Sequence, residues 1–518
     1  MTFWAGVREF SSGTRVSSSS KPPVGLAWRS STFLIVLTVN LAIFTDIFFY
    51  ALIVPVIPFA LSTQAHVPEE QVQQWTAILL ALYSVALFIG SPLAGLYADH
   101  TSSRRWPLLI GLVSLAASTL LLAFGNSIGL FVLGRLLQGL SAAVVWSVGC
   151  ALLVDTMESA VGVAMGYVNI SMSVALLIAP VIGGSVYGAV GYYAVYYISF
   201  GVIGVDILLR LVMIEKKVAK QWLPDPVYPA REGSGEGVGA TEKSVLGPRQ
   251  PSSEEPGTAG DVTPASGQPQ APQDEPTTSK KKPKSALVVL LGSRRLLAAL
   301  YGITAQACIM MGFDATLALF VQSTFDWDST AAGILFLAIF LPGFVSPLVG
   351  WLADRYGAKW PSVSGFTSTV PLLICIRFVT DNTFAHKALL VVLLVLLGTA
   401  LAFSNTPLMA EISYAIDALE AADPGCFGEK GAFGVGYGLF TMAFALGGVI
   451  GPLWAGYVIA AAGWGTMGWS FALLAASAAV VGVLWLGGPV KAWRKEEAAE
   501  ERQSEEGGQS AAAAAAAA

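Results

Sequence analysis

The chain has 518 residues, of which 54% are hydrophobic and only 12% are charged. Soluble domains carry roughly 25% charged residues, about twice the share found in this chain. With a mean hydropathy of +0.65, this composition indicates a membrane protein and excludes disordered, collagen-like and disulfide-framework classes. The net charge of −5 indicates no nucleic-acid partner, and three histidines with four scattered cysteines predict no metal site.

Long apolar stretches recur along the chain. A bilayer core of about 30 Å is crossed by about 20 helical residues, and a spanning segment must satisfy its own backbone hydrogen bonds. Twelve stretches meet this requirement, although Pro371 and Arg377 interrupt the ninth. The expected helices are 33–61, 74–97, 107–125, 129–153, 161–188, 192–214, 297–322, 330–353, 361–380, 388–410, 432–460 and 464–487.

Polar segments flank and separate these helices. Residues 1–32 and 489–518 are predicted to be disordered tails, and residues 215–294 a disordered linker, because their compositions cannot bury a core. If all three segments are cytoplasmic, the only Lys and Arg residues not on that side are Arg135, Arg210, Arg377 and Lys387. This positive-inside bias predicts an integral membrane protein with both termini in the cytoplasm, and no cleaved signal peptide is expected.

The two halves of the chain repeat each other. "GSPLAGLYADHTSSRRWP" matches "SPLVGWLADRYGAKWP", which makes Asp99 and Asp354 equivalent, and "APVIGG" matches "GPLWAG". Asp46 and Asp314 lie in the first helix of each half. Paired halves of this kind are typical of secondary transporters with a substrate site between them. We therefore expect an all-α membrane protein with twelve transmembrane helices in two pseudo-symmetric six-helix bundles, 33–214 and 295–488.

These motifs resemble the major facilitator superfamily over nearly the whole of 33–487. "GWLADRYGAK" at 350–359 follows the loop signature of that superfamily, and "TDIFFYALIVPVIP", "LGRLLQG" and "GGVIGPLWAG" are similar to the twelve-helix drug:proton antiporters, notably vesicular amine transporters and their fungal relatives. The resemblance implies transport driven by a proton gradient, without a cofactor. Charged positions of that family coincide with Asp46, Arg135, Asp206 and Asp314, whereas Tyr83, Ala402 and Thr441 stand where the amine carriers have charged residues. The resemblance therefore does not imply a monoamine substrate.

Charged residues inside the predicted helices are candidates for proton coupling or for lining a substrate cavity. A carboxylate near the bilayer centre is costly unless it is protonated, paired or facing water, so Asp46 and Asp314 are candidate proton sites. Arg135 stays charged and must face a cavity or a carboxylate, either as a responsive group or as a fixed tie between helices. Asp206 and Arg210 are spaced to neutralise each other within one helix. Six aromatic residues are candidate cavity-lining or packing residues: Phe48, Phe49, Tyr50, Tyr83, Trp146 and Tyr167.

Two further groups of residues are predicted to serve the transport cycle. A cytoplasmic gate, or alternatively a set of helix caps, is expected at the repeated loop, where ion pairs can hold one conformation and break in the other. Its members are Asp99, Arg104, Arg105, Gly350, Asp354, Arg355, Gly357 and Lys359. Tight helix packing in the antiporter-like motif is expected at Pro180, Gly183, Gly184, Gly447, Gly451, Pro452 and Gly456.

The leading functional interpretation is a proton-coupled antiporter, acting as a monomer in the lipid bilayer, that exports a small organic compound or loads it into an acidic compartment. No catalytic residues are predicted, and the sequence lacks the Walker motif of an ATP-driven pump. A uniporter or proton symporter that imports a nutrient, and a transporter-like receptor, are the alternatives. Plasma and vacuolar or vesicular membranes remain equally open.

Overall fold

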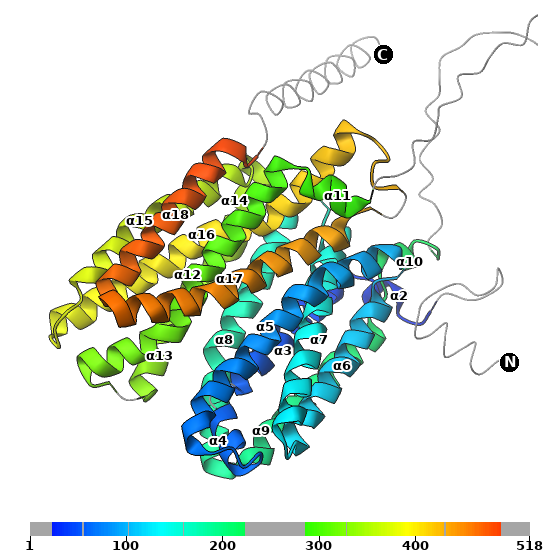
Figure 1. The fold of residues 1–518 in the computed structure, drawn as a ribbon. Coiled ribbons are helices and arrows are strands. Elements are labelled where there is room, and N and C mark those ends of the chain that lie inside the picture. Colours follow the sequence, from blue (N-terminus) through cyan, green and yellow to red (C-terminus); the bar gives the residue numbers. More distant parts are fainter. Residues whose placement is uncertain are drawn as a thin grey trace, which may run out of the picture. The chain divides into compact units, whose positions relative to one another are not determined.

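All regular elements in the described part of the chain are helices (Figure 1). The structure is a computed structural model, and it describes residues 23–53, 56–101, 103–158, 160–222, 285–327, 329–428 and 431–487. The longer helices are apolar around most of their circumference, which is the pattern of segments that lie in a membrane rather than at a water-facing surface.

In the described residues, the first half contains six long helices and three short ones. The long helices are α3 (Thr32–Ile53), α5 (Glu69–His100), α6 (Arg105–Phe124), α7 (Ile128–Thr156), α8 (Val161–Val190) and α9 (Tyr192–Val212). The short ones are α2 (Leu26–Arg29), α4 (Ile57–Thr63) and α10 (Lys216–Ala219). Helix α7 packs between α5 and α6, and α3 packs against α8.

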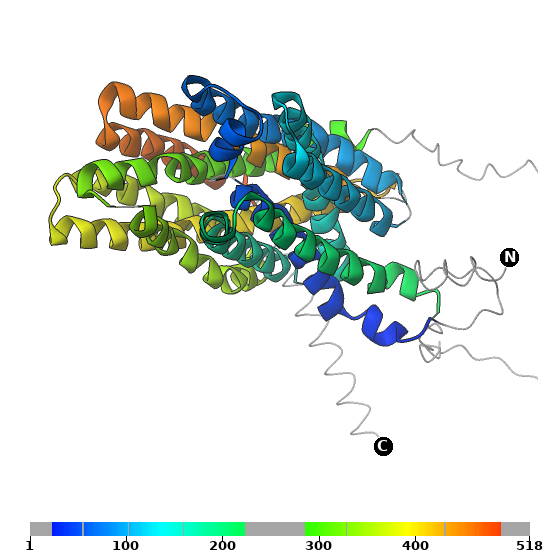
Figure 2. The same cartoon turned by 90° about the horizontal axis from the view of Figure 1, so that it is seen from below.

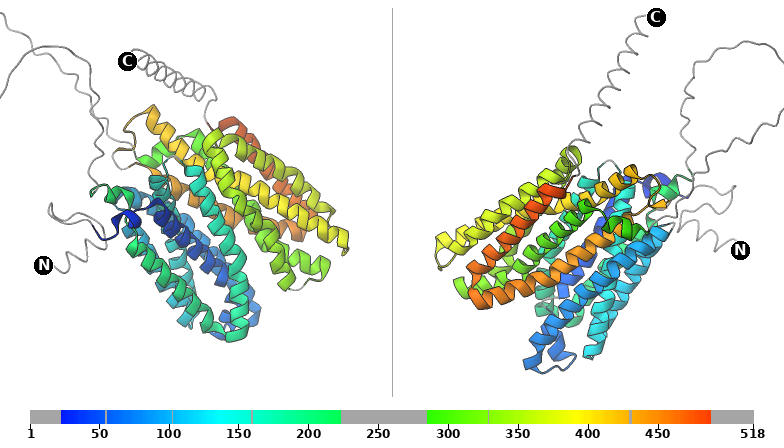
Figure 3. Two further views of the ribbon diagram at one scale, coloured as in Figure 1. Left: turned by 180° about the vertical axis from the view of Figure 1, so that it is seen from behind. Right: turned by 45° about the horizontal axis from the view of Figure 1, so that its top comes forward.

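The second half repeats this arrangement. Its helices are α11 (Ala286–Leu291), α12 (Arg294–Phe325), α13 (Ser329–Phe340), α14 (Ser346–Tyr356), α15 (Lys359–Cys375), α16 (Phe384–Ala422), α17 (Phe433–Ala462) and α18 (Trp464–Trp485). The 3₁₀ turns η1 (Leu341–Val345) and η2 (Ile376–Phe378) interrupt the series. Seen from below and from behind, the helices of the two halves form two neighbouring groups (Figures 2 and 3).

Eleven helical segments in the described residues are long and apolar enough to cross a membrane, one fewer than predicted, and one of them, Ile334–Tyr356, runs through α13, η1 and α14. The exception is the ninth expected span, 361–380, which the structure gives as α15, a 17-residue helix followed by η2. Helix α15 packs against both α16 and α18, so it keeps the place expected of a sixth helix in this half. Other boundaries also differ: the first expected span is divided into α3 and α4, and η1, which contains Pro342, separates α13 from α14.

The predicted disorder of 1–32 and 215–294 is wrong at the inner ends of both segments. Helix α2 and the residues after α9 are joined by Arg29, whose Nε donates to the Val212 carbonyl at 2.6 Å and whose carbonyl accepts from Ile214. Ile214 and Val218 bury apolar side chains there, and Leu290 of α11 is buried as well. The remainder of the predicted linker, 223–284, and the predicted tail 489–518 lie outside the described residues.

The halves meet through two equivalent pairs of helices. Helix α5 packs against α17, and α14 packs against α8, so the second helix of each half contacts the fifth helix of the other. Backbones approach very closely at both contacts: a Cβ atom on Gly95 would collide with the Gly434 carbonyl, and one on Gly350 with the Gly162 carbonyl. Glycine is therefore required at these positions for the closed contact between the halves.

Candidate functional site

Asp46 is the centre of a polar group buried among apolar helices. It lies on α3 and is completely buried. The indole Nε1 of Trp146 on α7 donates to its Oδ2 at 3.0 Å, and the Tyr83 hydroxyl on α5 donates to the same oxygen at 3.4 Å. Its Oδ1 has no hydrogen-bond partner in the part of the chain that the structure describes. The carboxyl group is thus held by neutral donors and not by a cation.

Arg135 lies beside this group on α7 and is also fully buried. One Nη donates to Gln138 Oε1 at 2.7 Å, whereas Nε and the second Nη have no partner among the described residues. The guanidinium stands 5.7 Å from the centre of the Tyr50 ring and 5.9 Å from that of Tyr83. Tyr83 therefore contacts both Asp46 and Arg135, which form no ion pair with each other.

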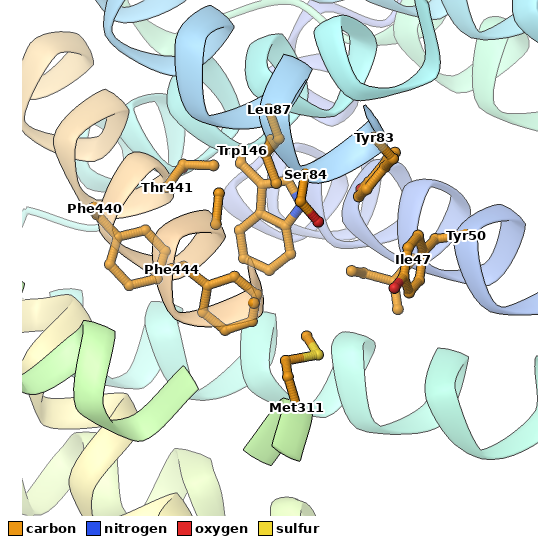
Figure 4. Close-up of a pocket in the computed structure, with 12 residues that line it drawn as sticks. Ile47, Tyr50, Tyr83, Ser84, Leu87, Trp146, Met311, Phe440, Thr441 and Phe444 are labelled. Atoms are coloured by element: carbon orange, nitrogen blue, oxygen red, sulfur yellow. The ribbon is translucent and has the colours of Figure 1, made fainter. Parts of the chain in front are cut away.

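A small cavity of about 40 Å³ adjoins these residues and is shared by both halves (Figure 4). Tyr50, Tyr83 and Trp146, three of the six aromatic residues for which the sequence left cavity lining and packing open, line it from the first half. Met311 of α12 and Phe440, Thr441 and Phe444 of α17 line it from the second half. We call it the aromatic cavity. Ligand pockets usually enclose several hundred Å³, so a substrate enters only if the helices move apart.

The other predicted aromatic residues do not line this cavity. Phe48 and Phe49 are buried in the packing of α3, and Tyr167 is exposed on α8. Phe440 and Phe444 were not foreseen from the sequence, because an isolated Phe in an apolar helix carries no signal that separates a cavity from a packed interface.

The remaining predicted intramembrane acids lie in different surroundings. Asp314 on α12 has an Oδ1 without a hydrogen-bond partner among the described residues, and it does not line the aromatic cavity. Asp206 on α9 forms a two-pronged ion pair with Arg210 at 2.9 and 3.0 Å, and Arg210 also donates to the Leu108 carbonyl. The charge of Asp206 is therefore neutralised by Arg210, four residues along the same helix, and Asp206 lies outside the aromatic cavity.

At the ends of the helices near α10, Asp99 joins the two halves. Its two carboxylate oxygens accept the backbone N–H groups of Gly434 and Val435 at 2.8 Å each, in the first turn of α17. Arg104 donates to Asp99 at 3.1 Å and to Asp155 at 2.9 Å. A carboxylate at a helix N-terminus is stabilised by unpaired N–H groups and by the helix dipole.

Asp354 makes the equivalent contact from the second half. Its oxygens accept the N–H groups of Gly162 at 2.6 Å and Val163 at 3.0 Å, in the first turn of α8, and the Tyr414 hydroxyl at 2.5 Å. Each repeated aspartate thus caps a helix of the opposite half. The sequence indicated the aspartates but not their partners, because backbone N–H groups have no sequence signature.

Several residues of the predicted gate do not contact the opposite half. Arg105 donates to the Leu211 carbonyl within its own half. Arg355 is exposed over the rings of Trp351 and Tyr356, and Lys359 lies over Trp360. Gly357, with a φ of +83°, lets the chain turn after α14. Of the predicted gate residues that the structure describes, Asp99 and Asp354 bond to the opposite half, and Gly350 lies against Gly162 of α8. Arg104 reaches this contact through its ion pair with Asp99, within its own half.

The predicted packing residues also divide into two groups. Cβ atoms on Gly447 and Gly451 would collide with the backbone of α12, and one on Gly183 would collide with the Leu52 carbonyl of α3. Gly184 and Gly456 have open space at the Cβ position, so the predicted close packing is wrong there. Pro180 and Pro452 lie inside α8 and α17.

This difference gives a matched test within α17. Gly451→Ala is expected to destabilise the chain by about 1–3 kcal/mol, because the new methyl group has no room beside Cys308. Gly456→Ala, five residues further along the same helix, should leave the chain at least as stable, since alanine is the better helix former. Thermal unfolding in detergent measures both, and equal midpoints would contradict the close α12–α17 contact.

Two repeated bundles of apolar helices with a cavity lined by both are the architecture of a secondary transporter. The family model of the Major Facilitator Superfamily matches residues 39–422. The chain belongs to this superfamily.

Similar proteins of known sequence extend over most of the chain. An uncharacterized MFS-type transporter of Schizosaccharomyces pombe is 32% identical over 437 residues, which cover 83% of this chain and 90% of the relative. The MFS-type transporter ppzB of Metarhizium rileyi is 31% identical over 472 residues, which cover 90% of this chain and 97% of the relative. These relatives are transporters and not enzymes.

The comparison with solved structures supports the fold. The human organic anion transporter MFSD10 (TETRAN) has a TM-score of 0.59 at 17% identity, covering 87% of this chain and 99% of that one. Shorter stretches are similar to two further transporters. The class B tetracycline resistance protein of Escherichia coli is 33% identical over 26% of this chain and 32% of the relative. The vesicular acetylcholine transporter of Torpedo marmorata is 28% identical over 39% of this chain and 44% of the relative.

Proposed function

We propose that this chain is a proton-coupled antiporter that exchanges a small organic compound for protons across its membrane. The proposal rests mainly on the surroundings of Asp46. Its carboxyl group is completely buried beside a cavity that both halves line, and it accepts hydrogen bonds from two neutral donors without a counter-ion among the described residues. The proton gradient supplies the energy, and neither a cofactor nor a second subunit is needed.

Both protonation states of Asp46 are accommodated in this arrangement. The protonated form needs no counter-ion in a low-dielectric interior. The ionised form is supported by hydrogen bonds from the N–H of Trp146 and the hydroxyl of Tyr83, and the Tyr83 ring in turn lies beside the guanidinium of Arg135. A group that is stable in either form can load and release a proton as the cavity opens to each side in turn.

The helix-end contacts supply the alternating access that antiport requires. We assign this end, which carries the linker, to the cytoplasm, so the structure represents a state closed on that side. Opening it must separate Asp99 from α17 and Asp354 from α8. Arg135, which lies over the Tyr50 ring, remains available to respond to the charge of the aromatic cavity.

The named relatives support a small organic substrate without fixing its identity. One is a tetracycline resistance protein, another a vesicular acetylcholine transporter, and the similar fold is that of an organic anion transporter. The aromatic cavity suits a flat or cationic group, because aromatic faces attract cations. Export across a plasma membrane and loading of an acidic vacuole or vesicle are the same reaction in different membranes.

The decisive experiment is substrate-dependent proton flux. Liposomes that contain the purified full-length chain, with a pH-sensitive dye trapped inside, are given an imposed pH gradient and then tetracycline or acetylcholine as probes. We expect a transported probe to dissipate the gradient and to accumulate against its own gradient. Accumulation only to equilibrium, with no proton movement, would establish a uniporter instead.

A further inference from the structure

A second cavity, of about 30 Å³, lies between the halves on the other side of α12. Its walls come from α8, α12, α13, η1 and α16, whereas the aromatic cavity is formed by α3, α5, α7, α12 and α17. In the internal repeat, α12, α16 and α8 are the counterparts of α3, α7 and α17. The second cavity is therefore the pseudo-symmetric equivalent of the aromatic cavity, and the adjacent residues Met310 and Met311 line the two.

Amide side chains distinguish this second cavity, which we call the amide cavity. Asn405 Nδ2 on α16 donates to Asn169 Oδ1 on α8 at 3.0 Å, and Asn169 Nδ2 donates to the Ser346 hydroxyl on α14 at 2.5 Å. Gln306 on α12 lies in the same cavity wall and makes only a 3.8 Å contact to the sulfur of Met310. All three amide side chains are buried, so they are withheld from bulk water.

The chain of amide hydrogen bonds leaves two acceptors without donors. Gln306 Oε1 and Asn405 Oδ1 have no hydrogen-bond partner in the described residues, although Gln306 is only 2% exposed and Asn405 only 3%. Buried polar atoms in this condition are costly and call for an explanation such as a bound ligand group. A purely structural tie between α8 and α16 needs Asn169 and Asn405, but it does not account for Gln306.

The chemistry of the lining restricts what such a group is. None of the twelve residues that line the amide cavity is charged. An ammonium group would lose its hydration there without a counter-charge, which is far more costly than burying a neutral group. The two free acceptors therefore match an uncharged donor, such as a hydroxyl or an amide N–H.

We propose that the amide cavity is a specificity site that binds a hydroxyl or carboxamide group of the transported compound through Gln306 and Asn405. This inference rests on the proposed transport function and adds to it a substrate class: a molecule with an apolar or aromatic part and a separate, uncharged hydrogen-bonding group. Selection by such a site is strong, because an analogue without the group leaves buried acceptors unpaired.

Ligand binding to the purified full-length chain tests this proposal separately from transport. The probes are matched pairs of aromatic amines that differ only by a hydroxyl or carboxamide in place of a methyl group, for example tyramine and 4-methylphenethylamine. Thermal stabilisation in detergent is recorded against probe concentration. We expect polar members to reach half-maximal stabilisation at concentrations at least about tenfold lower than their methyl partners, the ratio expected for one hydrogen bond.

Variants assign that preference to the amide cavity. Gln306→Met and Asn405→Leu should remove the preference while still binding the methyl members, and Gln306→Met should fold because it removes a buried unpaired oxygen. Asn40→Leu is the control, since Asn40 is an amide of α3 that accepts from Ser171 outside both cavities. If Asn405→Leu does not fold, the probe preference of Gln306→Met alone tests the proposal.

The outcomes separate this proposal from the transport function. A preference that survives Gln306→Met, or a panel in which no polar member stabilises the wild-type chain more than its partner, would overturn the amide site, whether or not proton flux is observed. A preference that is lost in Gln306→Met, in a chain with no substrate-dependent proton flux, would support the amide site and refute antiport.

Discussion

Asp46→Asn is expected to abolish accumulation of substrate driven by a pH gradient while leaving the chain folded. An amide of the same shape is cheaper to bury than an unpaired carboxylate, and its oxygen can still accept from Trp146. It cannot release a proton, so proton and substrate fluxes lose their coupling. Accumulation in liposomes should fall to the level of equilibration, while exchange of substrate between two equal pools persists.

Asp206→Asn is the informative control for this prediction. Asp206 is as buried as Asp46 but is paired with Arg210, so its neutralisation leaves a buried cation alone, at a cost of about 3–5 kcal/mol. We expect that variant to lose folded protein and not coupling. If Asp46→Asn still concentrates substrate, the proton site passes to Asp314 and the double variant decides. If Asp46→Asn and Asp314→Asn both still accumulate substrate under a pH gradient, proton antiport through these two acids is wrong.

Local patterns were sufficient to predict the class of fold. Apolar stretches of about 20 residues predict spanning helices, since no other open structure satisfies the backbone in lipid. The ninth span was predicted too long because hydropathy does not register that α15 ends at Cys375 in a 3₁₀ turn that contains Arg377, whereas Pro371 lies inside the helix. Likewise, the overall polarity of 215–294 concealed the few apolar residues that anchor its ends.

Only those site residues could be predicted that stand out individually in the sequence. An aspartate in the middle of an apolar helix is one such residue, and the aspartate that recurs at the ends of two equivalent helices is another. The partners of Asp99 and Asp354 are backbone groups more than 190 residues away in sequence, and they follow only from the packing of α5 on α17 and α14 on α8. Gln306 and Asn405 gave no signal because the sequence does not show whether an amide in an apolar helix faces a cavity or ties two helices together.

The gate aspartates should control which side of the membrane the carrier faces. Asp99→Asn and Asp354→Asn each remove a charge that caps a helix of the other half, and each hydrogen bond to a charged group contributes about 1.5–3 kcal/mol. Losing one such hydrogen bond lowers the ratio of the closed to the open conformation by about tenfold or more. We expect turnover in liposomes to fall by about that factor in each variant, because the chain no longer closes this end efficiently.

Accessibility should report the same shift independently of turnover. A cysteine in place of Ser91, buried on α5 where α17 crosses it, is expected to react faster with a membrane-impermeant thiol reagent when Asp99 is replaced by Asn. Glu215→Gln is the matched control, because Glu215 also accepts a backbone N–H at a helix start, that of Arg105 at 2.7 Å, but within one half. It should lower stability without opening the gate. Wild-type turnover and unchanged labelling in Asp99→Asn would show that the repeated aspartate is a helix cap and that alternating access is held by other contacts.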